Sequence, residues 1–233
     1  MIKRIIQSIP NTITSMNLLS GLIAVYFSFH AAEMFGPLAG FQWVFIAIGA
    51  AALFDFCDGA SARLLHAYSE LGKELDSLAD LVSFGVAPAM LLLNTISTVS
   101  GCSWVSYAAL FIPLMGALRL AKFNIDDTQS VTFSGLPIPA NAIFWIGFTA
   151  WIWGTGYCPS AWVVLPVIAF VSLLMVSRMR MFSLKFKNFA LRENFSRYVI
   201  LLAAVVFVAM YGVSGLMWTI MLYVLISAVV KKN

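Results

Sequence analysis

The sequence predicts an all-α integral membrane protein, a polytopic bundle of about eight transmembrane helices. Hydrophobic residues make up 61% of the 233 residues and charged residues only 10%, with a mean hydropathy of +0.93. A soluble domain carries about 25% charged residues. The apolar residues form continuous runs of the length that a helix needs to cross a bilayer, roughly 20 residues, whereas a transmembrane barrel would need short alternating segments.

Charged and turn residues divide the chain into eight apolar segments. We expect spans at 12–31, 41–65, 72–96, 104–125, 138–153, 161–177, 198–211 and 216–230. The last two are short and close together, which predicts a hairpin that packs after a six-helix core. The first follows Lys3 and Arg4, as in a signal peptide, but it is too long and no small-residue cleavage pattern closes it. We therefore expect a permanent first span.

The basic residues predict the orientation of these spans. With eight spans and a cytoplasmic N-terminus, all 14 lysines and arginines fall on the cytoplasmic side, as the positive-inside rule requires. The opposite loops contain Glu33 and no basic residue. Both termini are thus expected in the cytoplasm, with the protein in the cell (inner) membrane. The net charge of +4 then reflects topology and affinity for anionic lipid headgroups, and gives no support for a nucleic acid partner.

Four aspartates interrupt the second and third spans, where an unpaired charge is costly and a functional site is the first hypothesis. Asp55 and Asp58 are three residues apart and Asp76 and Asp80 are four apart, so each pair lies on one helix face. The rise of about 1.5 Å per residue in antiparallel helices brings Asp55 level with Asp80, and Asp58 level with Asp76. The sequence predicts a pocket of four carboxylates that opens to the cytoplasm.

Charge balance and small residues indicate the chemistry of this pocket. Two divalent cations would neutralise four carboxylates, and a donor set of oxygen atoms favours magnesium, manganese or calcium over zinc. Such a pair suits a phosphoryl or phosphatidyl displacement. Gly59 and Ala62 leave a trough on the same helix face, and Arg63 is placed to hold a phosphate oxygen. The alternatives are tight helix packing for the small residues and an interfacial position for Arg63.

This pattern resembles the signature of the CDP-alcohol phosphotransferase family. Each signature position holds the expected residue: Asp55, Asp58, Gly59, Ala62, Arg63, Gly72, Asp76 and Asp80. The resemblance implies a membrane enzyme that transfers a phosphatidyl or similar group from a CDP-linked donor to an alcohol and releases CMP. It implies that Asp55, Asp58 and Asp76 ligate two divalent cations, magnesium or manganese, that Asp80 contributes to the metal site and is the general base, and that the enzyme is a homodimer.

In this interpretation residues 1–233 form a single domain, with a catalytic core over 1–187 and a C-terminal helical hairpin over 188–233. The first span carries Thr14 and Asn17 on one face, in a region that helps to line the nucleotide pocket in the family. The expected nucleotide and diphosphate-binding residues are then Thr14, Asn17, Gly59, Ala62, Arg63 and Gly72.

The end of the fourth span and the segments 133–142 and 174–187 resemble the phosphatidylserine synthase branch. The glycerol-phosphate branch usually carries an arginine where Asn17 stands, so an acceptor without a phosphate is favoured. The resemblance implies CDP-diacylglycerol as donor and L-serine as acceptor, with Arg119, Lys122 and Asn124 at the acceptor site and Arg119 or Lys122 as the counter-ion of the serine carboxylate. Inositol, choline or glycerol phosphate are alternative acceptors, and the two basic residues are equally explained as topology signals.

A cation transporter is an alternative of another class, because transporters also use intramembrane aspartates. Their charges lie near the midplane with access to both faces, often in paired halves of the chain. Here both aspartate pairs are displaced toward one side, and the later spans contain no second acidic set. The sequence thus favours the enzyme.

Overall fold

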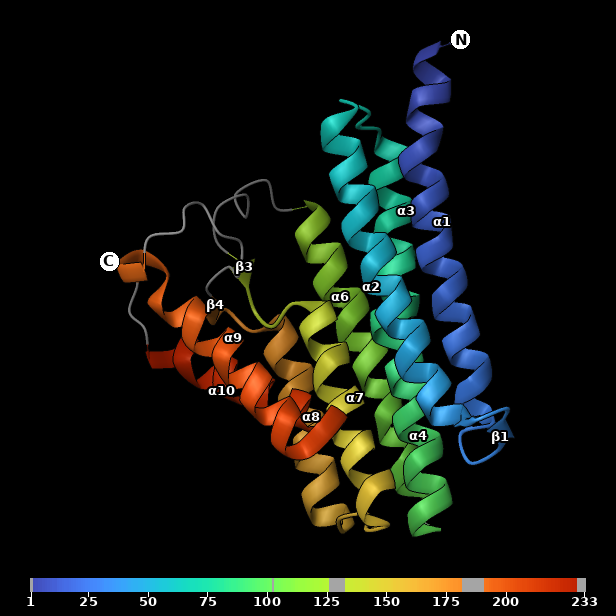
Figure 1. The fold of residues 1–233 in the computed structure, drawn as a ribbon, viewed down its shortest axis with the longest axis vertical. Helices are drawn as coiled ribbons and strands as arrows, with labels where there is room; N and C mark the ends of the chain where they lie inside the picture. Colours follow the sequence, from blue (N-terminus) through green and yellow to red (C-terminus); the bar gives the residue numbers. More distant parts are fainter. Residues whose placement is uncertain (1, 102, 126–132, 182–190, 230–233) are drawn as a thin grey trace.

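The protein is a bundle of helices in a computed structural model that describes residues 2–101, 103–125, 133–181 and 191–229 (Figure 1). The α-helices are α1 (Ile2–Phe29), α2 (Gly40–Leu64), α3 (Glu70–Asp80), α4 (Ala87–Ser100), α5 (Ser103–Ser106), α6 (Phe111–Ile125), α7 (Ile138–Thr155), α8 (Ala161–Val176), α9 (Leu191–Tyr211) and α10 (Gly215–Val229). A π-helical turn, η1 (Leu81–Val86), joins α3 to α4, and the 3₁₀ turns η2 (Tyr107–Leu110) and η4 (Gly212–Ser214) join α5 to α6 and α9 to α10.

Several of these helices are long and apolar enough to cross a membrane. Five such segments are Ser8–Phe29, Gly40–Leu64, Glu70–Ser100, Trp104–Ile125 and Asn194–Val229, and α8 is a shorter apolar helix. Each of the eight apolar segments that the sequence delimits contains a helix. The prediction of a multi-pass, all-helical membrane protein is therefore confirmed.

Two features of the backbone differ from the expected pattern. The third apolar segment is one continuous helix from Glu70 to Ser100, but the π-helical turn η1 interrupts its regular hydrogen bonding immediately after Asp80. The described residues also contain four very short strands: β1 (Met34–Phe35) pairs with β2 (Leu38–Ala39), and β3 (Phe133–Ser134) with β4 (Arg180–Met181), both antiparallel. At two residues each, these strands are too short to leave a period-2 pattern in the sequence.

The helices fall into two groups by direction. Helices α1, α2, α3, α4, α6, α7 and α8 run roughly along the long axis of the molecule, whereas α9 and α10 cross it obliquely on one side (Figure 1). Helix α1 packs along α2 and also contacts α3, η1 and α4, while α10 packs on α7 and α9. The C-terminal hairpin thus lies against the bundle through α7, on the side away from α1.

Glycines allow the closest approaches between helices. A Cβ on Gly21 of α1 would lie 2.4 Å from Ser83 Oγ of η1, and a Cβ on Gly147 of α7 would lie 2.3 Å from the backbone nitrogen of Met217 in α10. Real Cβ atoms do not approach so closely, so only glycine allows α1 to reach η1 and α7 to reach α10 at these points. The first contact positions the end of α3 and the second positions the hairpin.

Candidate metal and active site

Three aspartates from two antiparallel helices converge in the described part of the chain. One carboxylate oxygen each from Asp55, Asp76 and Asp80 lies within 4.8 Å of the others. Asp55 projects from α2, and Asp76 and Asp80 project from successive turns of α3 because residues four apart share a helix face. The start of α3 is fixed by Ser69, whose hydroxyl accepts a hydrogen bond from the Gly72 backbone N–H at 3.0 Å, as an N-cap residue does.

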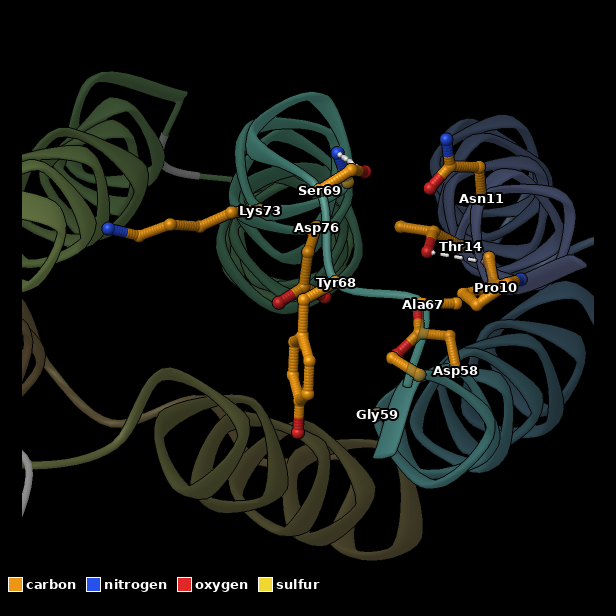
Figure 2. A pocket seen from close by; sticks show the side chains of 12 residues that line it. Pro10, Asn11, Thr14, Asp58, Gly59, Ala67, Tyr68, Ser69, Lys73 and Asp76 are labelled. Atoms are coloured by element: carbon orange, nitrogen blue, oxygen red, sulfur yellow. Dashed lines mark hydrogen bonds between the residues drawn. The ribbon is translucent and has the colours of Figure 1, made fainter. Parts of the chain in front are cut away.

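The fourth aspartate, Asp58, lies one turn further along α2 and lines a pocket next to this cluster. The pocket has a volume of about 210 Å³. It is lined by Pro10, Asn11, Thr14, Asp58, Gly59, Ala62, Ala67, Tyr68, Ser69, Gly72, Lys73 and Asp76. In Figure 2 the carboxylates of Asp58, from α2, and Asp76, from α3, both point into the space between these helices and α1. Asp76 therefore belongs to both the carboxylate cluster and the pocket.

The carboxylates fit a hard divalent cation. Buried oxygens Oδ2 of Asp58, Oδ1 of Asp76 and Oδ1 of Asp80 have no hydrogen-bond partner, and no lysine or arginine among the described residues forms an ion pair with these three. Buried carboxylate oxygens without partners are unfavourable unless protons or cations neutralise them. Because the converging donors are carboxylate oxygens, with no cysteine or histidine in the cluster, the set suits a cation such as magnesium or manganese.

The two signature glycines serve different purposes. A Cβ on Gly72 would lie 2.9 Å from Asn11 Oδ1 and 3.0 Å from Ser69 Oγ, so this glycine allows α3 to approach α1. A Cβ on Gly59 would meet no atom within 4 Å, although Gly59 lines the pocket. Gly59 thus leaves open volume beside Asp58, and Ala62, one turn further on, lines the same pocket.

The two polar residues of α1 lie in different surroundings. Thr14 lines the pocket, where its side chain lies beside Asp58 and its hydroxyl donates to the Pro10 carbonyl at 3.0 Å (Figure 2). Asn17 is not among the residues that line the pocket. It lies one turn further from the start of α1, fully buried and beside Asp80.

The predicted acceptor residues of α6 lie in three different environments. Arg119 is close enough to Asp80 and to Tyr223 of α10 for electrostatic interaction, and its buried Nε has no hydrogen-bond partner. Lys122 is exposed, as is Arg63 on α2, and neither lines the pocket. The Asn124 side chain exchanges hydrogen bonds of 3.0 and 3.3 Å with Ser77 Oγ of α3, and the Asn124 backbone carbonyl accepts one of 3.1 Å from Lys73 Nζ. Asn124 therefore ties α6 to α3.

Several residues near the site are absent from the sequence prediction. Six of them line the pocket: Pro10, Asn11, Ala67, Tyr68, Ser69 and Lys73. Ser69 has a detectable signal, since a serine directly before a helix is typical of an N-cap. The approach of Tyr223 to Arg119 depends on how α10 packs, which no local pattern encodes. Residues 182–187, in the basic part of the segment 174–187, lie outside the described residues.

Comparison with known proteins identifies relatives over most of the chain. A sequence model of the CDP-alcohol phosphatidyltransferase family matches residues 7–175. A CDP-diacylglycerol–serine O-phosphatidyltransferase of Mycobacterium leprae is 37% identical over 185 residues, which cover 76% of this chain and 58% of that relative. A protein of the same name from Methanocaldococcus jannaschii is 36% identical over 175 residues, 75% of this chain and 73% of the relative. One from Bacillus subtilis is 40% identical over 139 residues, 56% and 69% respectively.

The family match covers most of the residues described above, but not Tyr223. The four aspartates, Thr14, Asn17 and the α6 residues all lie within residues 7–175, whereas Tyr223 lies beyond it. The chain spans less than two thirds of the length of the Mycobacterium leprae relative.

Proposed function

The chain belongs to the CDP-alcohol phosphatidyltransferase family, and from that premise we propose that it transfers the phosphatidyl group of CDP-diacylglycerol to L-serine, giving phosphatidylserine and CMP. The observation that carries the proposal is the convergence of Asp55, Asp76 and Asp80 beside a pocket that Asp58 and Asp76 both line. The serine acceptor is supported by the names of the three relatives described above.

Asp55, Asp58, Asp76 and Asp80 are proposed to hold two divalent cations, magnesium or manganese. When bound, such cations neutralise the carboxylates and stabilise negative charge on the attacking and leaving oxygens of the displacement. The buried carboxylate oxygens without partners support this assignment. The pocket of about 210 Å³ then receives the nucleotide and diphosphate against Thr14, Gly59, Ala62 and Gly72, with Arg63 near its outer edge.

Asp80 is proposed as the general base of a direct displacement. Its carboxylate takes the proton of the serine hydroxyl as that oxygen forms a bond to the lipid-linked phosphorus. The bond from this phosphorus to the oxygen that bridges to CMP breaks, and CMP leaves with the electron pair. Arg119, next to Asp80, is proposed to pair with the serine carboxylate, while Lys122 and Asn124 lie further along α6 at the same end.

We further propose an eight-span topology with both termini and the active site on the cytoplasmic side of the cell membrane. Residues 1–187 would form the catalytic core and 188–233 the hairpin, and the protein would be a homodimer. The shared end of α3 and α6 that carries Lys73, Lys122 and the Lys73–Asn124 hydrogen bond supports a cytoplasmic location for this end.

The proposal is tested by assay of the purified protein with radiolabelled CDP-diacylglycerol and one alcohol at a time. We expect labelled phosphatidylserine with L-serine and only background product with inositol, choline or glycerol phosphate. Chelation of divalent cations should abolish turnover, and magnesium or manganese should restore it. Preferential use of another alcohol would contradict the acceptor assignment, and full activity after chelation would contradict the metal assignment.

A further inference from the structure

The Asn17 side chain is a buried polar group that interacts with Asp80 but makes no well-formed hydrogen bond. The residue is 0% exposed, and its amide interacts with the Asp80 carboxylate although neither Oδ1 nor Nδ2 has a partner in full hydrogen-bond geometry. A buried polar group left unpaired destabilises a protein, because its lost contacts with water are not replaced. An asparagine retained in such a position therefore calls for an explanation.

The backbone around Asn17 is held firmly. Its carbonyl accepts a hydrogen bond of 3.0 Å from the hydroxyl of Ser83, which is itself 0% exposed. One turn later in α1, Gly21 packs so closely on Ser83 that a Cβ would lie 2.4 Å from its Oγ. Helix α1 is thereby fixed against the π-helical turn that follows Asp80.

A third helix holds the π-helical turn from the other side. Asn141 Nδ2 of α7 donates to the Phe84 carbonyl at 3.3 Å, and Trp145 Nε1 donates to Asn141 Oδ1 at 2.8 Å. Asn141 and Trp145 are both 0% exposed. The amides of Asn17 and Asn141 thus differ: Asn141 completes a buried network, whereas the Asn17 amide is presented beside Asp80 by a rigid backbone. This arrangement is typical of a preorganised ligand contact.

The position of Asn17 indicates which ligand it contacts. The pocket assigned to the nucleotide is lined by Thr14, one turn earlier in α1, but not by Asn17. Asn17 instead neighbours Asp80, where the acceptor hydroxyl would lose its proton, and Arg119 also approaches Asp80 with an unpartnered Nε. The buried Asn17 amide of α1 and the unpartnered Nε of Arg119 in α6 thus both lie near Asp80.

We propose that Asn17 is a specificity residue for the acceptor, its Oδ1 accepting a hydrogen bond from the ammonium group of an amino-acid alcohol whose carboxylate pairs with Arg119. The inference deepens the proposed function and rests on it. A neutral amide oxygen binds an ammonium group without adding a fifth negative charge beside four carboxylates. A site built to bind an N–H group discriminates strongly against analogues that lack it, because its own polar atom is then left unpaired.

The test compares three acceptors on purified Asn17→Ala and Asn17→Leu proteins. L-Serine carries both charged groups, 3-hydroxypropionate lacks the ammonium, and ethanolamine lacks the carboxylate. Asn17→Leu retains much of the side-chain volume, so it controls for a cavity in Asn17→Ala. Thr14→Val provides the matched variant, one turn earlier on the same helix and in the nucleotide pocket. Binding of CMP and thermal stability are measured alongside, because neither depends on turnover.

We expect both Asn17 variants to raise KM for L-serine by about 10-fold or more, equivalent to the loss of one hydrogen bond to a charged group. KM for CDP-diacylglycerol and the affinity for CMP should stay within about twofold, and the preference for serine over 3-hydroxypropionate should fall. Arg119→Ala should instead reduce the preference for serine over ethanolamine. Thr14→Val should weaken CMP binding and leave the acceptor preference unchanged.

Two results would overturn the inference alone. If the Asn17 variants weaken CMP binding while KM for serine is unchanged, Asn17 serves the nucleotide. If kcat falls equally for all acceptors with no change in preference, Asn17 only positions Asp80. A wild-type protein that rejects serine and accepts another alcohol would instead contradict the proposed function, and with it the ammonium contact.

Discussion

Two hollows in the described part of the chain differ in size and chemistry. The pocket beside the aspartates has a volume of about 210 Å³, and its lining from α1, α2, α3 and the segment before α3 includes acidic, basic and hydroxyl side chains beside small and apolar residues. A larger hollow of about 510 Å³ lies among α7, α8 and α10. Its lining is wholly apolar: Leu136, Phe144, Phe148, Pro166, Val167, Phe170, Val171, Leu174, Met217, Ile220, Met221, Val224 and Leu225.

This difference teaches that size alone is a poor guide to the active site of a membrane protein. Apolar surface that faces lipid is not penalised, so an apolar hollow needs no function to persist. A charged side chain in a membrane span is unfavourable and is retained for a reason. We therefore propose that the smaller hollow carries the chemistry and that substitutions in the larger one leave turnover unchanged.

The largest difference in kcat is expected between a substitution of Asp80, in the carboxylate cluster, and a substitution of Phe170, which lines the apolar hollow. We expect Asp80→Asn to lower kcat by about 10²–10⁴-fold, because the variant cannot accept the hydroxyl proton. Phe170→Leu should leave kcat within about twofold, since exposed substitutions change stability by about 0.5 kcal/mol or less. Initial rates of phosphatidylserine formation at saturating substrates measure both, and near-normal turnover of Asp80→Asn would exclude Asp80 as the base.

A second comparison concerns the KM for CDP-diacylglycerol after substitution of two glycines of α2. A Cβ at Gly59 or at Gly49 would meet no atom within 4 Å, but only Gly59 lines the pocket. Gly59→Ala should fold normally and raise KM for CDP-diacylglycerol by about 5- to 100-fold, because the methyl group occupies ligand space at about 1–3 kcal/mol. Gly49→Ala should leave KM unchanged. Equal KM values for the two variants would show that the donor does not approach Gly59.

Substitutions at two glycines of α7 provide a test in the apolar region. There we expect a change in the stability of the protein and no change in kcat. Gly147→Ala would place a Cβ 2.3 Å from Met217 N, whereas Gly154→Ala meets no atom within 4 Å. We expect Gly147→Ala to destabilise the protein by about 1–3 kcal/mol. Thermal unfolding in detergent should show a lower midpoint for Gly147→Ala than for Gly154→Ala. Equal midpoints would mean that α10 does not depend on this contact.

Much of the fold and the aspartate cluster was predictable because both depend on local patterns. Apolar runs locate the helices, and spacings of three and four residues place each aspartate pair on one face. The convergence of Asp55, Asp76 and Asp80 then follows from an antiparallel helix pair. The family resemblance inferred from these positions is confirmed by the match over residues 7–175.

The remaining features depend on contacts between distant segments. Nothing in the sequence around Ser83 predicts a π-helical turn, because that turn is held by Asn17 and Asn141 from other helices. The separation of Asn17 from the pocket that Thr14 lines, and the approach of Tyr223 to Arg119, likewise depend on helix packing. These are the places where tertiary contacts decide what a residue can reach.

The smallest expected effect concerns the hydrogen bonds between Asn124 and Ser77, which tie α6 to α3 at the polar end. Asn124→Ala should lower the free energy of unfolding by about 1 kcal/mol and raise the divalent-cation concentration for half-maximal activity, because α3 carries Asp76 and Asp80. The control is Asn94→Ala, whose amide Nδ2 bonds only within α4, to Met90 O at 2.9 Å. Its cation requirement should match that of the wild type.

A double-mutant cycle isolates this tie between α3 and α6. Because Ser77 and Asn124 bond to each other, the combined variant should be less destabilised than the sum of the single variants, by about 0.5–1.5 kcal/mol. Additive losses would mean that each side chain acts alone. In that case the position of α3 would depend on the contacts of Gly72 with α1 and of η1 with α1 and α7, and the polar pocket, like the apolar hollow, would be held by helix packing.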